Sequence, residues 1–99
     1  MPLGYAFNAV QCFVLLALMA QITGHKAGMA THHIVNAHIY ENQVEGVKQM
    51  LEREPFPLPC LAINELILSL EDIETWVSSA DFQAIGYTHH KPISFPFTV

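Results

Sequence analysis

Residues 8–23 read NAVQCFVLLALMAQIT, a run in which apolar side chains would cover most of a helix surface. Asn8 suits the N-cap position, and Gly24 suits the position just after a helix, where a left-handed backbone is common. A helix on the surface would have a polar face, which this run lacks. The pattern therefore predicts a buried helix from Asn8 to Thr23.

A period-two pattern follows between Ala30 and Tyr40. Alternate residues of a strand point to opposite faces. One predicted face carries the hydrogen-bonding side chains of Asn36, His38 and Tyr40 together with Ile34. The other face is largely apolar, with His33, Val35, Ala37 and Ile39. The segment predicts a strand with one polar and one apolar face.

Shorter elements are predicted after Tyr40. A helix over residues 42–53 ends at a cluster of three prolines, and residues 60–64 suit a short strand. Ser69 and Asp72 have the spacing of a capping box that opens a helix through Trp76, and Ser79 is expected to cap another turn. Residues 82–99 predict two short strands around a connection at 86–92. The expected fold class is α+β, as one domain over residues 1–99.

The composition limits the possible functions. Hydrophobic residues make up 52% and charged residues only 13%, against about 25% charged in an ordinary soluble domain. Residues 1–40 contain no Asp or Glu, whereas all nine acidic residues lie between Glu41 and Asp81. We therefore expect a partner to cover the N-terminal part. The net charge of −5, with four basic residues, argues against a nucleic-acid surface.

The two cysteines and the apolar run bear on location. Cys12 and Cys60 are far apart and outside any C-x-x-C pattern, which predicts reduced core thiols and a cytoplasmic protein. The strictly apolar run from Phe13 to Ala20 is shorter than the ~20 residues that span a bilayer, so no membrane is expected. A signal peptide is the rival interpretation, although no Lys or Arg precedes the run.

Few patterns of catalytic chemistry are present. The adjacent His32 and His33 would point to opposite strand faces, and no carboxylate or thiol stands at ligand spacing, so no metal site is predicted. Glycine-rich phosphate loops and the nucleophile elbow are absent from the sequence. Cys12 lies in the apolar run, where desolvation disfavours a thiolate, so no catalytic cysteine is expected.

A polar trio remains in this apolar setting: Asn8, His38 and Tyr40. Each could simply pair with a buried backbone group. Four motifs give the trio another meaning. They are PLGYAFN at residues 2–8, NAHIYEN at 36–42, LEREPFPLP at 51–59, and DFQAIGYTHH at 81–90. Their order and spacing resemble the C-terminal portion of the thymidylate synthase family, in a bacterial-type branch.

The resemblance implies a fold and a reaction. The family fold has a long buried helix and a mixed sheet that packs against the sheet of a second copy in a homodimer. The family converts dUMP and 5,10-methylenetetrahydrofolate to dTMP and dihydrofolate without a metal. In that reaction a cysteine thiolate adds to C6 of the uracil, and folate supplies first the one-carbon unit and then a hydride.

The resemblance also implies roles for individual residues. Asn8 matches the asparagine that reads the pyrimidine edge, because an amide offers the donor and acceptor that O4 and N3–H require. His38 and Tyr40 match the pair that binds the 3′-hydroxyl of the deoxyribose. The folate neighbourhood corresponds to Leu3, Gly4 and Phe7. The matches for the closing tail, which excludes water, are Thr98 and Val99.

This sequence departs from the family pattern in ways that affect activity. The family's nucleophilic cysteine, in a Pro-Cys-His context, and its phosphate-binding arginines have no match here, so we expect a fragment that is inactive alone. Ala6 replaces the usual proline, and residues 34–37 replace Gly-Gly-Asp-Thr. Two alternatives stay open: a dUMP hydroxymethylase of the same family, and a non-catalytic truncated module that dimerises through its sheet.

Overall fold

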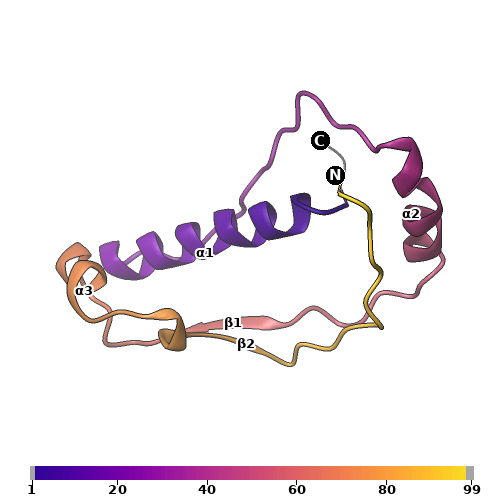
Figure 1. Cartoon of the computed structure of the whole chain (residues 1–99). Coiled ribbons are helices and arrows are strands. Elements are labelled where there is room, and N and C mark those ends of the chain that lie inside the picture. Colours follow the sequence, from indigo (N-terminus) through magenta and orange to yellow (C-terminus); the bar gives the residue numbers. More distant parts are fainter. Residues whose placement is uncertain (1, 98–99) are drawn as a thin grey trace.

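The computed structural model describes residues 2–97 and has an α+β arrangement (Figure 1). A long helix crosses the middle of the molecule, a two-stranded sheet lies beside it, and short helices stand at the two ends. In chain order the elements are α1 (Tyr5–Thr23), η1 (Glu41–Gln43), α2 (Val44–Leu51), β1 (Cys60–Ile63), α3 (Leu70–Thr75), η2 (Ser79–Asp81) and β2 (Phe82–Ile85).

Helix α1 begins earlier than the sequence predicts. Its N-cap is Gly4, and the backbone N–H of Asn8 already donates to the carbonyl of Gly4 at 3.2 Å. The prediction that Asn8 caps the helix was therefore wrong, because the apolar residues before it extend the helix by another turn. The other end is as predicted, since Gly24 follows α1 with φ of 72° in the left-handed region.

The prediction that α1 is buried was wrong for the described chain. Only Leu18 and Ala20 of the helix are buried, and Phe7 is 78% exposed. Cys12, expected in the core, is exposed as well, as is Cys60; both are free thiols. The physical reason is that the described segments cover only the C-terminal end of α1, where Asn64 and Ile67 contact Gln21.

α1 is long and apolar enough to cross a membrane, but the core helix of a soluble protein and a signal sequence pass the same test. Its C-terminal end contacts the rest of the described chain. The side-chain amide of Gln21 donates to the carbonyls of Asn64 and Ile67, each at 2.9 Å. Ile67 is completely buried. This end of the helix is therefore fixed to the rest of the chain by both polar and apolar contacts.

Residues 30–40 do not form the predicted strand. They run as an extended loop with a bend at 35–36, and Val35 is fully exposed. An extended segment becomes a strand only when a neighbouring strand pairs with its backbone. Within residues 2–97 the only paired strands are β1 and β2. The predicted strand was therefore wrong for the described chain, because no strand within residues 2–97 pairs with this segment.

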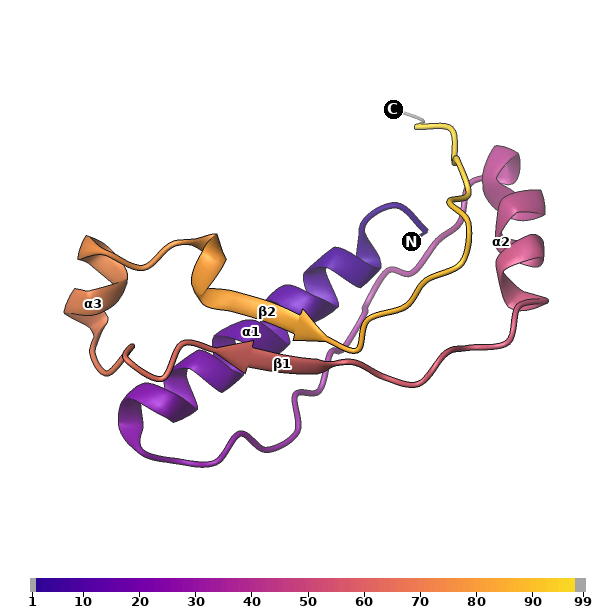
Figure 2. The same ribbon diagram turned by 90° about the horizontal axis from the view of Figure 1, so that it is seen from below.

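The sheet is smaller than predicted. β1 and β2 are antiparallel, with Cys60 opposite Ile85 and Ile63 opposite Phe82. In Figure 1 they run below α1, and in the view of Figure 2 they cross over it. The strand over 60–64 and the first tail strand were predicted correctly, whereas a mixed sheet and a second tail strand are not formed within residues 2–97. Gly86, with φ of 75°, ends β2 and turns the tail away.

The short helices follow their predicted caps closely. The Ser69 hydroxyl accepts from the backbone N–H of Asp72, and the Asp72 carboxylate accepts from that of Ser69, both at 3.2 Å. This capping box opens α3 as predicted. Before η2 the cap is Ser78 rather than Ser79, and its N–H donates to Asp81 Oδ2 at 2.8 Å.

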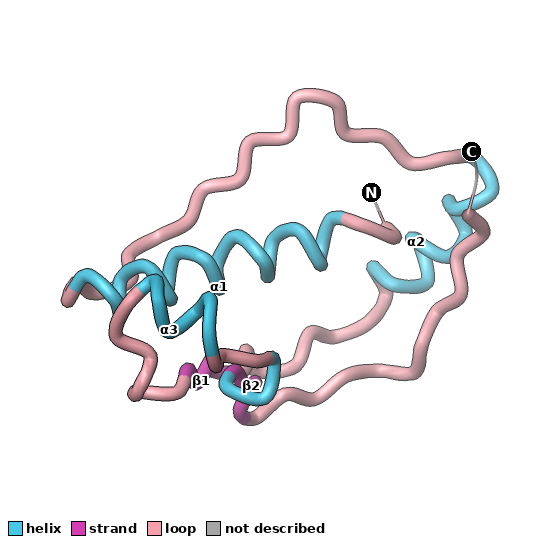
Figure 3. Tube along the Cα trace, turned by 60° about the vertical axis from the view of Figure 1, so that its left-hand side comes forward, coloured by secondary structure: helices cyan, strands magenta, loops and turns pink. Residues whose placement is uncertain are grey.

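The molecule is open in shape. The Cα radius of gyration is 16.7 Å, against about 13 Å for a compact domain of this length. The tube in Figure 3 shows that long loops join α1, α2 and the sheet. The described chain thus has a small apolar core of Leu18, Ala20 and Ile67, whereas large apolar side chains along the rest of α1 are exposed.

Candidate functional site

The loop before η1 brings His38 and Tyr40 together. Their ring centroids are 5.4 Å apart, with an interplanar angle of 73° that gives an edge-to-face contact. His38 Nδ1 lies 3.2 Å from the carbonyl oxygen of Asn36. Both side chains belong to exposed residues. Although the strand is absent, the backbone is extended enough to place residues two apart on the same side.

Gln43 joins this loop to the C-terminal tail. Its Oε1 accepts from the backbone N–H of Tyr40 at 3.3 Å, and its Nε2 donates to the carbonyl of Pro96 at 3.0 Å. In addition the Gln43 N–H donates to the Tyr40 carbonyl at 2.9 Å. Gln43 is only 3% exposed, the single buried polar residue of the described chain. It therefore connects two segments 53 residues apart.

The tail also packs directly on α2. A Cβ built on Gly46 would lie 2.6 Å from Cε1 of the Phe95 ring, closer than any real Cβ contact. Only a glycine therefore lets the ring take this position against the helix. The yellow tail segment accordingly runs beside α2 in Figures 1 and 2. Sequence reasoning missed both Gln43 and Gly46, although Gln43 stands at capping-box spacing from Tyr40.

The other candidate residues lie at the two ends of the chain. Leu3 and Gly4 precede α1, and Phe7 and Asn8 lie in its first turns, all exposed. Within residues 2–97 no hydrogen bond or ring contact joins Asn8 to His38 or Tyr40. The trio therefore stays a prediction. Thr98 and Val99 lie outside the described residues.

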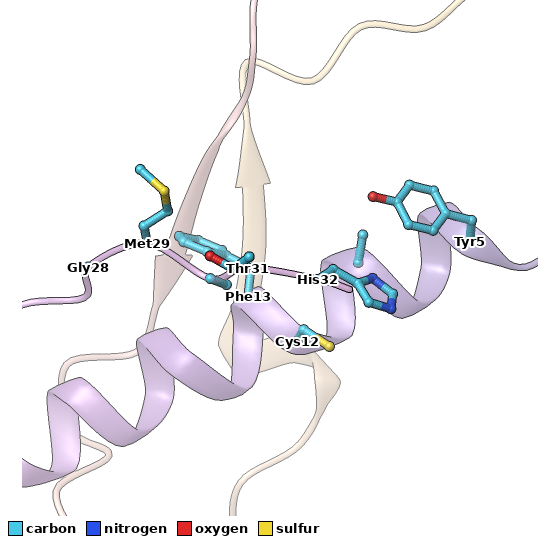
Figure 4. Close-up of a pocket in the computed structure, with 9 residues that line it drawn as sticks. Tyr5, Cys12, Phe13, Gly28, Met29, Thr31 and His32 are labelled. Atoms are coloured by element: carbon cyan, nitrogen blue, oxygen red, sulfur yellow. The ribbon is translucent and has the colours of Figure 1, made fainter. Parts of the chain in front are cut away.

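One open hollow of about 650 Å³ lies between α1 and the loop that follows it (Figure 4). The rings of Tyr5 and His32 stack there, with centroids 5.3 Å apart. Cys12 and Phe13 line the helix side, and Met29 and Thr31 line the loop side. Its lining carries no acidic or basic residue besides His32. We read the hollow as the uncovered apolar face of α1.

A second hollow, of about 450 Å³, lies where two sequence motifs meet. His90 stacks on Phe56 with ring centroids 4.3 Å apart, and its Nε2 lies 2.8 Å from the carbonyl oxygen of Glu54. The Arg53 guanidinium donates to the carbonyl of Lys91 at 2.8 Å. The proline-rich turn and the segment after β2 are thus held together by contacts that use the charged and aromatic residues of both motifs.

The described residues offer little for covalent or metal chemistry. Within residues 2–97 no group of three or more His, Cys, Asp or Glu side chains could hold a metal ion. The carboxylates with altered acidity are structural. Hydrogen bonds from the Leu68 N–H and then the Trp76 indole lower the pKa of Asp72, and the Asn64 amide and then the Ser78 N–H lower that of Asp81.

Comparison with known proteins decides what these motifs are. A model of the family "Thymidylate synthase" matches residues 1–99, the whole length of the chain. The chain belongs to the thymidylate synthase family. The bacterial-type resemblance read from the four motifs is therefore confirmed, and the α+β class of the described residues is compatible with it.

Relatives in the thymidylate synthase family are close over this segment. Each of the following is named thymidylate synthase and aligns over 99 residues, which is 99% of this chain and 35% of the relative. The identity is 65% for Idiomarina loihiensis, 64% for Shewanella pealeana and 61% for Haemophilus influenzae strain PittEE. The chain thus spans about a third of the length of these relatives. No solved structure matched it.

Proposed function

We propose that this chain is the C-terminal part of a thymidylate synthase, which forms dTMP and dihydrofolate from dUMP and 5,10-methylenetetrahydrofolate. The observation that carries the proposal is the identity of 61–65% to thymidylate synthases, continuous over 99 residues. The chain covers 35% of those relatives, so the activity belongs to a larger protein. On its own the chain should be inactive, because it contributes contacts and no nucleophile.

Within that enzyme His38 and Tyr40 hold the 3′-hydroxyl of the deoxyribose. The support is the edge-to-face contact of the two rings, whose centroids are 5.4 Å apart, so that the imidazole and the phenol lie side by side. An imidazole nitrogen and a phenol can each donate or accept, so together they satisfy one hydroxyl. Asn8 reads the uracil edge through its amide, which can donate to O4 and accept from N3–H.

The folate lies against the start of α1. Leu3, Gly4 and Phe7 supply an apolar, sterically open neighbourhood, and Phe7 has 78% of its surface exposed for such a contact. A planar pterin gains from stacking on apolar or aromatic side chains. Thr98 and Val99 close the site and exclude water, which strengthens every polar interaction inside it.

The uncovered part of α1 is covered in the assembled enzyme, and a second copy packs on the sheet to form a homodimer. The support is the exposure of large apolar side chains along α1, for example Val10 at 63% and Leu15 at 59%. A soluble protein rarely leaves such a continuous patch in water. An assembled enzyme of this kind is cytoplasmic, consistent with two unpaired thiols.

A chimera tests the proposal. Residues 1–99 replace the matching segment of the Idiomarina loihiensis thymidylate synthase, and the rate of dihydrofolate formation with dUMP is measured together with the identity of the nucleotide product. We expect dTMP at a rate within about tenfold of the parent enzyme, and no turnover by the 99-residue chain alone. A folded, dimeric chimera that forms no dTMP would overturn the proposal, and 5-hydroxymethyl-dUMP would assign the other reaction.

A further inference from the structure

Gln43 is the single buried polar residue of the described chain. Its oxygen and its nitrogen are used on opposite sides, by the Tyr40 N–H and the Pro96 carbonyl respectively. The loop that carries His38 and Tyr40 therefore cannot shift relative to the tail without breaking a buried hydrogen bond. A buried amide left without a partner costs more free energy than the hydrogen bond itself contributes.

Gly46, three residues after Gln43, contacts the same tail through steric fit. The Phe95 ring lies where a side chain on residue 46 would stand, with 2.6 Å from Cε1 to the position of a Cβ. The polar contact sits on Pro96 and the apolar contact on Phe95, so two adjacent tail residues are held by η1 and α2. These contacts lie just before Thr98, the first residue of the predicted lid.

We propose that Gln43 is a positioning residue that couples the His38 and Tyr40 loop to the C-terminal tail, with Gly46 as the seat for Phe95. This inference rests on the proposed function, because the tail and the loop are assigned to folate closure and to the ribose. A change in the position of the loop is then transmitted through the Gln43 amide to Pro96, and a change in the position of the tail is transmitted back to the loop. Gln43 itself touches neither ligand.

The first test needs no activity and uses the 99-residue chain in solution. The nuclear Overhauser effect between the Phe95 ring and Gly46 Hα reports whether the ring packs against Gly46. Hydrogen exchange of the Gln43 side-chain amide reports its hydrogen bond to the Pro96 carbonyl. We expect Gly46→Ala and Phe95→Ala each to speed this exchange about threefold to tenfold, the factor for one hydrogen bond of ordinary net strength. Gly28→Ala is the matched control, because a Cβ there meets no heavy atom within 4 Å.

The double variant Gly46→Ala with Phe95→Ala distinguishes loss of the contact between Phe95 and Gly46 from a general loss of stability. If the added methyl acts by displacing the ring, then it has little further effect once the ring is removed, so the two changes are not additive. Additive effects, or an exchange rate equal to that of the wild type in both single variants, would refute the claim that the Phe95 ring must pack against Gly46. Circular dichroism checks that each variant keeps its helices.

The second test is kinetic and uses the chimera described above. Gln43→Glu keeps an acceptor for the Tyr40 N–H but presents a carboxylate to the Pro96 carbonyl, so the tail is released while η1 is kept. We expect kcat/KM for folate to fall about tenfold, with KM for dUMP raised at least threefold. Glu45→Gln, at an exposed position in the first turn of the adjacent helix α2, is the control.

Failure of the proposed function and failure of the inference about Gln43 give different results. A chimera without any dTMP formation contradicts the proposed function but leaves the exchange and Overhauser experiments to decide the link. An active chimera in which Gln43→Glu lowers stability yet leaves both KM values and kcat unchanged would show that Gln43 is only structural, and would overturn the inference.

Discussion

The side-chain amide of Asn64 donates to the carboxylate of Asp81 at 2.9 Å, and the backbone of Asn64 also donates to the Asp81 carbonyl at 2.8 Å. The two residues tie the end of β1 to the start of β2. The amide is the main cause of the lowered pKa of Asp81, followed by the Ser78 N–H. The ionised carboxylate is therefore the form that the folded chain prefers.

This relationship predicts a loss of stability in acid. A carboxylate whose pKa is lowered by folding stabilises the fold above its ordinary pKa of about 4, and this stabilisation is lost as the pH falls through the folded-state value. Asp72 acts in the same direction, since the Leu68 N–H and the Trp76 indole lower its pKa. The urea midpoint should stay level from about pH 7 to 5 and fall below about pH 4.

Asp81→Asn isolates the contribution of this carboxylate. The variant should be less stable than the wild type at neutral pH and should lose less on acidification, because the group that must be protonated is gone. Glu74→Gln, on the exposed side of α3, serves as the control. Parallel acid curves for the wild type and Asp81→Asn would contradict the assignment.

A second prediction concerns the anchor of α1. Gln21→Ala removes the donor for both Asn64 and Ile67 carbonyls. Each net hydrogen bond is worth about 1 kcal/mol, so we expect a loss of about 1–2 kcal/mol in the free energy of unfolding. The matched control is Gln11→Ala, an exposed glutamine of the same helix, which should change stability by less than about 0.5 kcal/mol. Chemical denaturation followed by circular dichroism measures both.

Local signals predicted local structure well. Ser69 with Asp72 and the glycine at 24 specify a helix start and a helix end through contacts within a few residues, and both appear as predicted. His38 and Tyr40 share one side because their spacing alone decides it. Such features depend on backbone geometry and not on distant parts of the chain.

Sequence patterns whose structure depends on contacts with distant segments were poorer predictors. The period-two pattern at 30–40 reports which face is buried in a sheet, and no strand within residues 2–97 pairs with it. The apolar surface of α1 likewise indicated burial, yet Phe7 is 78% exposed. The link through Gln43 was missed because its two partners are far apart in sequence, and a lone glutamine carries no periodic signal.

A third prediction tests the role of Asn8 in the chimera. Asn8→Asp replaces the side-chain amide nitrogen, the donor for uracil O4, with an acceptor, which suits the 4-amino group of cytosine instead. We expect kcat/KM for dUMP to fall by at least about 100-fold, the usual scale when a site's polar groups are left unpaired. Turnover of dCMP should rise relative to dUMP. An unchanged ratio of the two rates would remove Asn8 from the pyrimidine edge.

A fourth prediction concerns the ribose. Tyr40→Phe removes one hydroxyl from the pair with His38 while keeping the ring contact at 5.4 Å. For dUMP the KM should rise about tenfold, because one hydrogen bond within a closed site is lost. For the analogue that lacks the 3′-hydroxyl the same substitution should have little effect. Equal losses for both nucleotides would place Tyr40 away from the sugar.

The fifth prediction uses Cys12 to ask what covers α1. The thiol is exposed in the described chain, and it lines the open hollow against the loop at 28–32. A maleimide should therefore label Cys12 in the 99-residue chain nearly as fast as a free thiol. In the chimera, the remaining two-thirds of the enzyme should cover the helix. Labelling of Cys12 should then slow at least about tenfold, because the thiol can react only after local opening.

Mass spectrometry of the labelled peptides separates Cys12 from other thiols, and Cys12→Ala confirms the assignment. Cys60 lies opposite Ile85 at one end of the two-stranded sheet, so its labelling reports whether that end is covered as well. If Cys12 reacts equally fast in the chain and in an active chimera, then α1 is a surface helix in the enzyme, and its apolar residues need another explanation than burial by the rest of the protein.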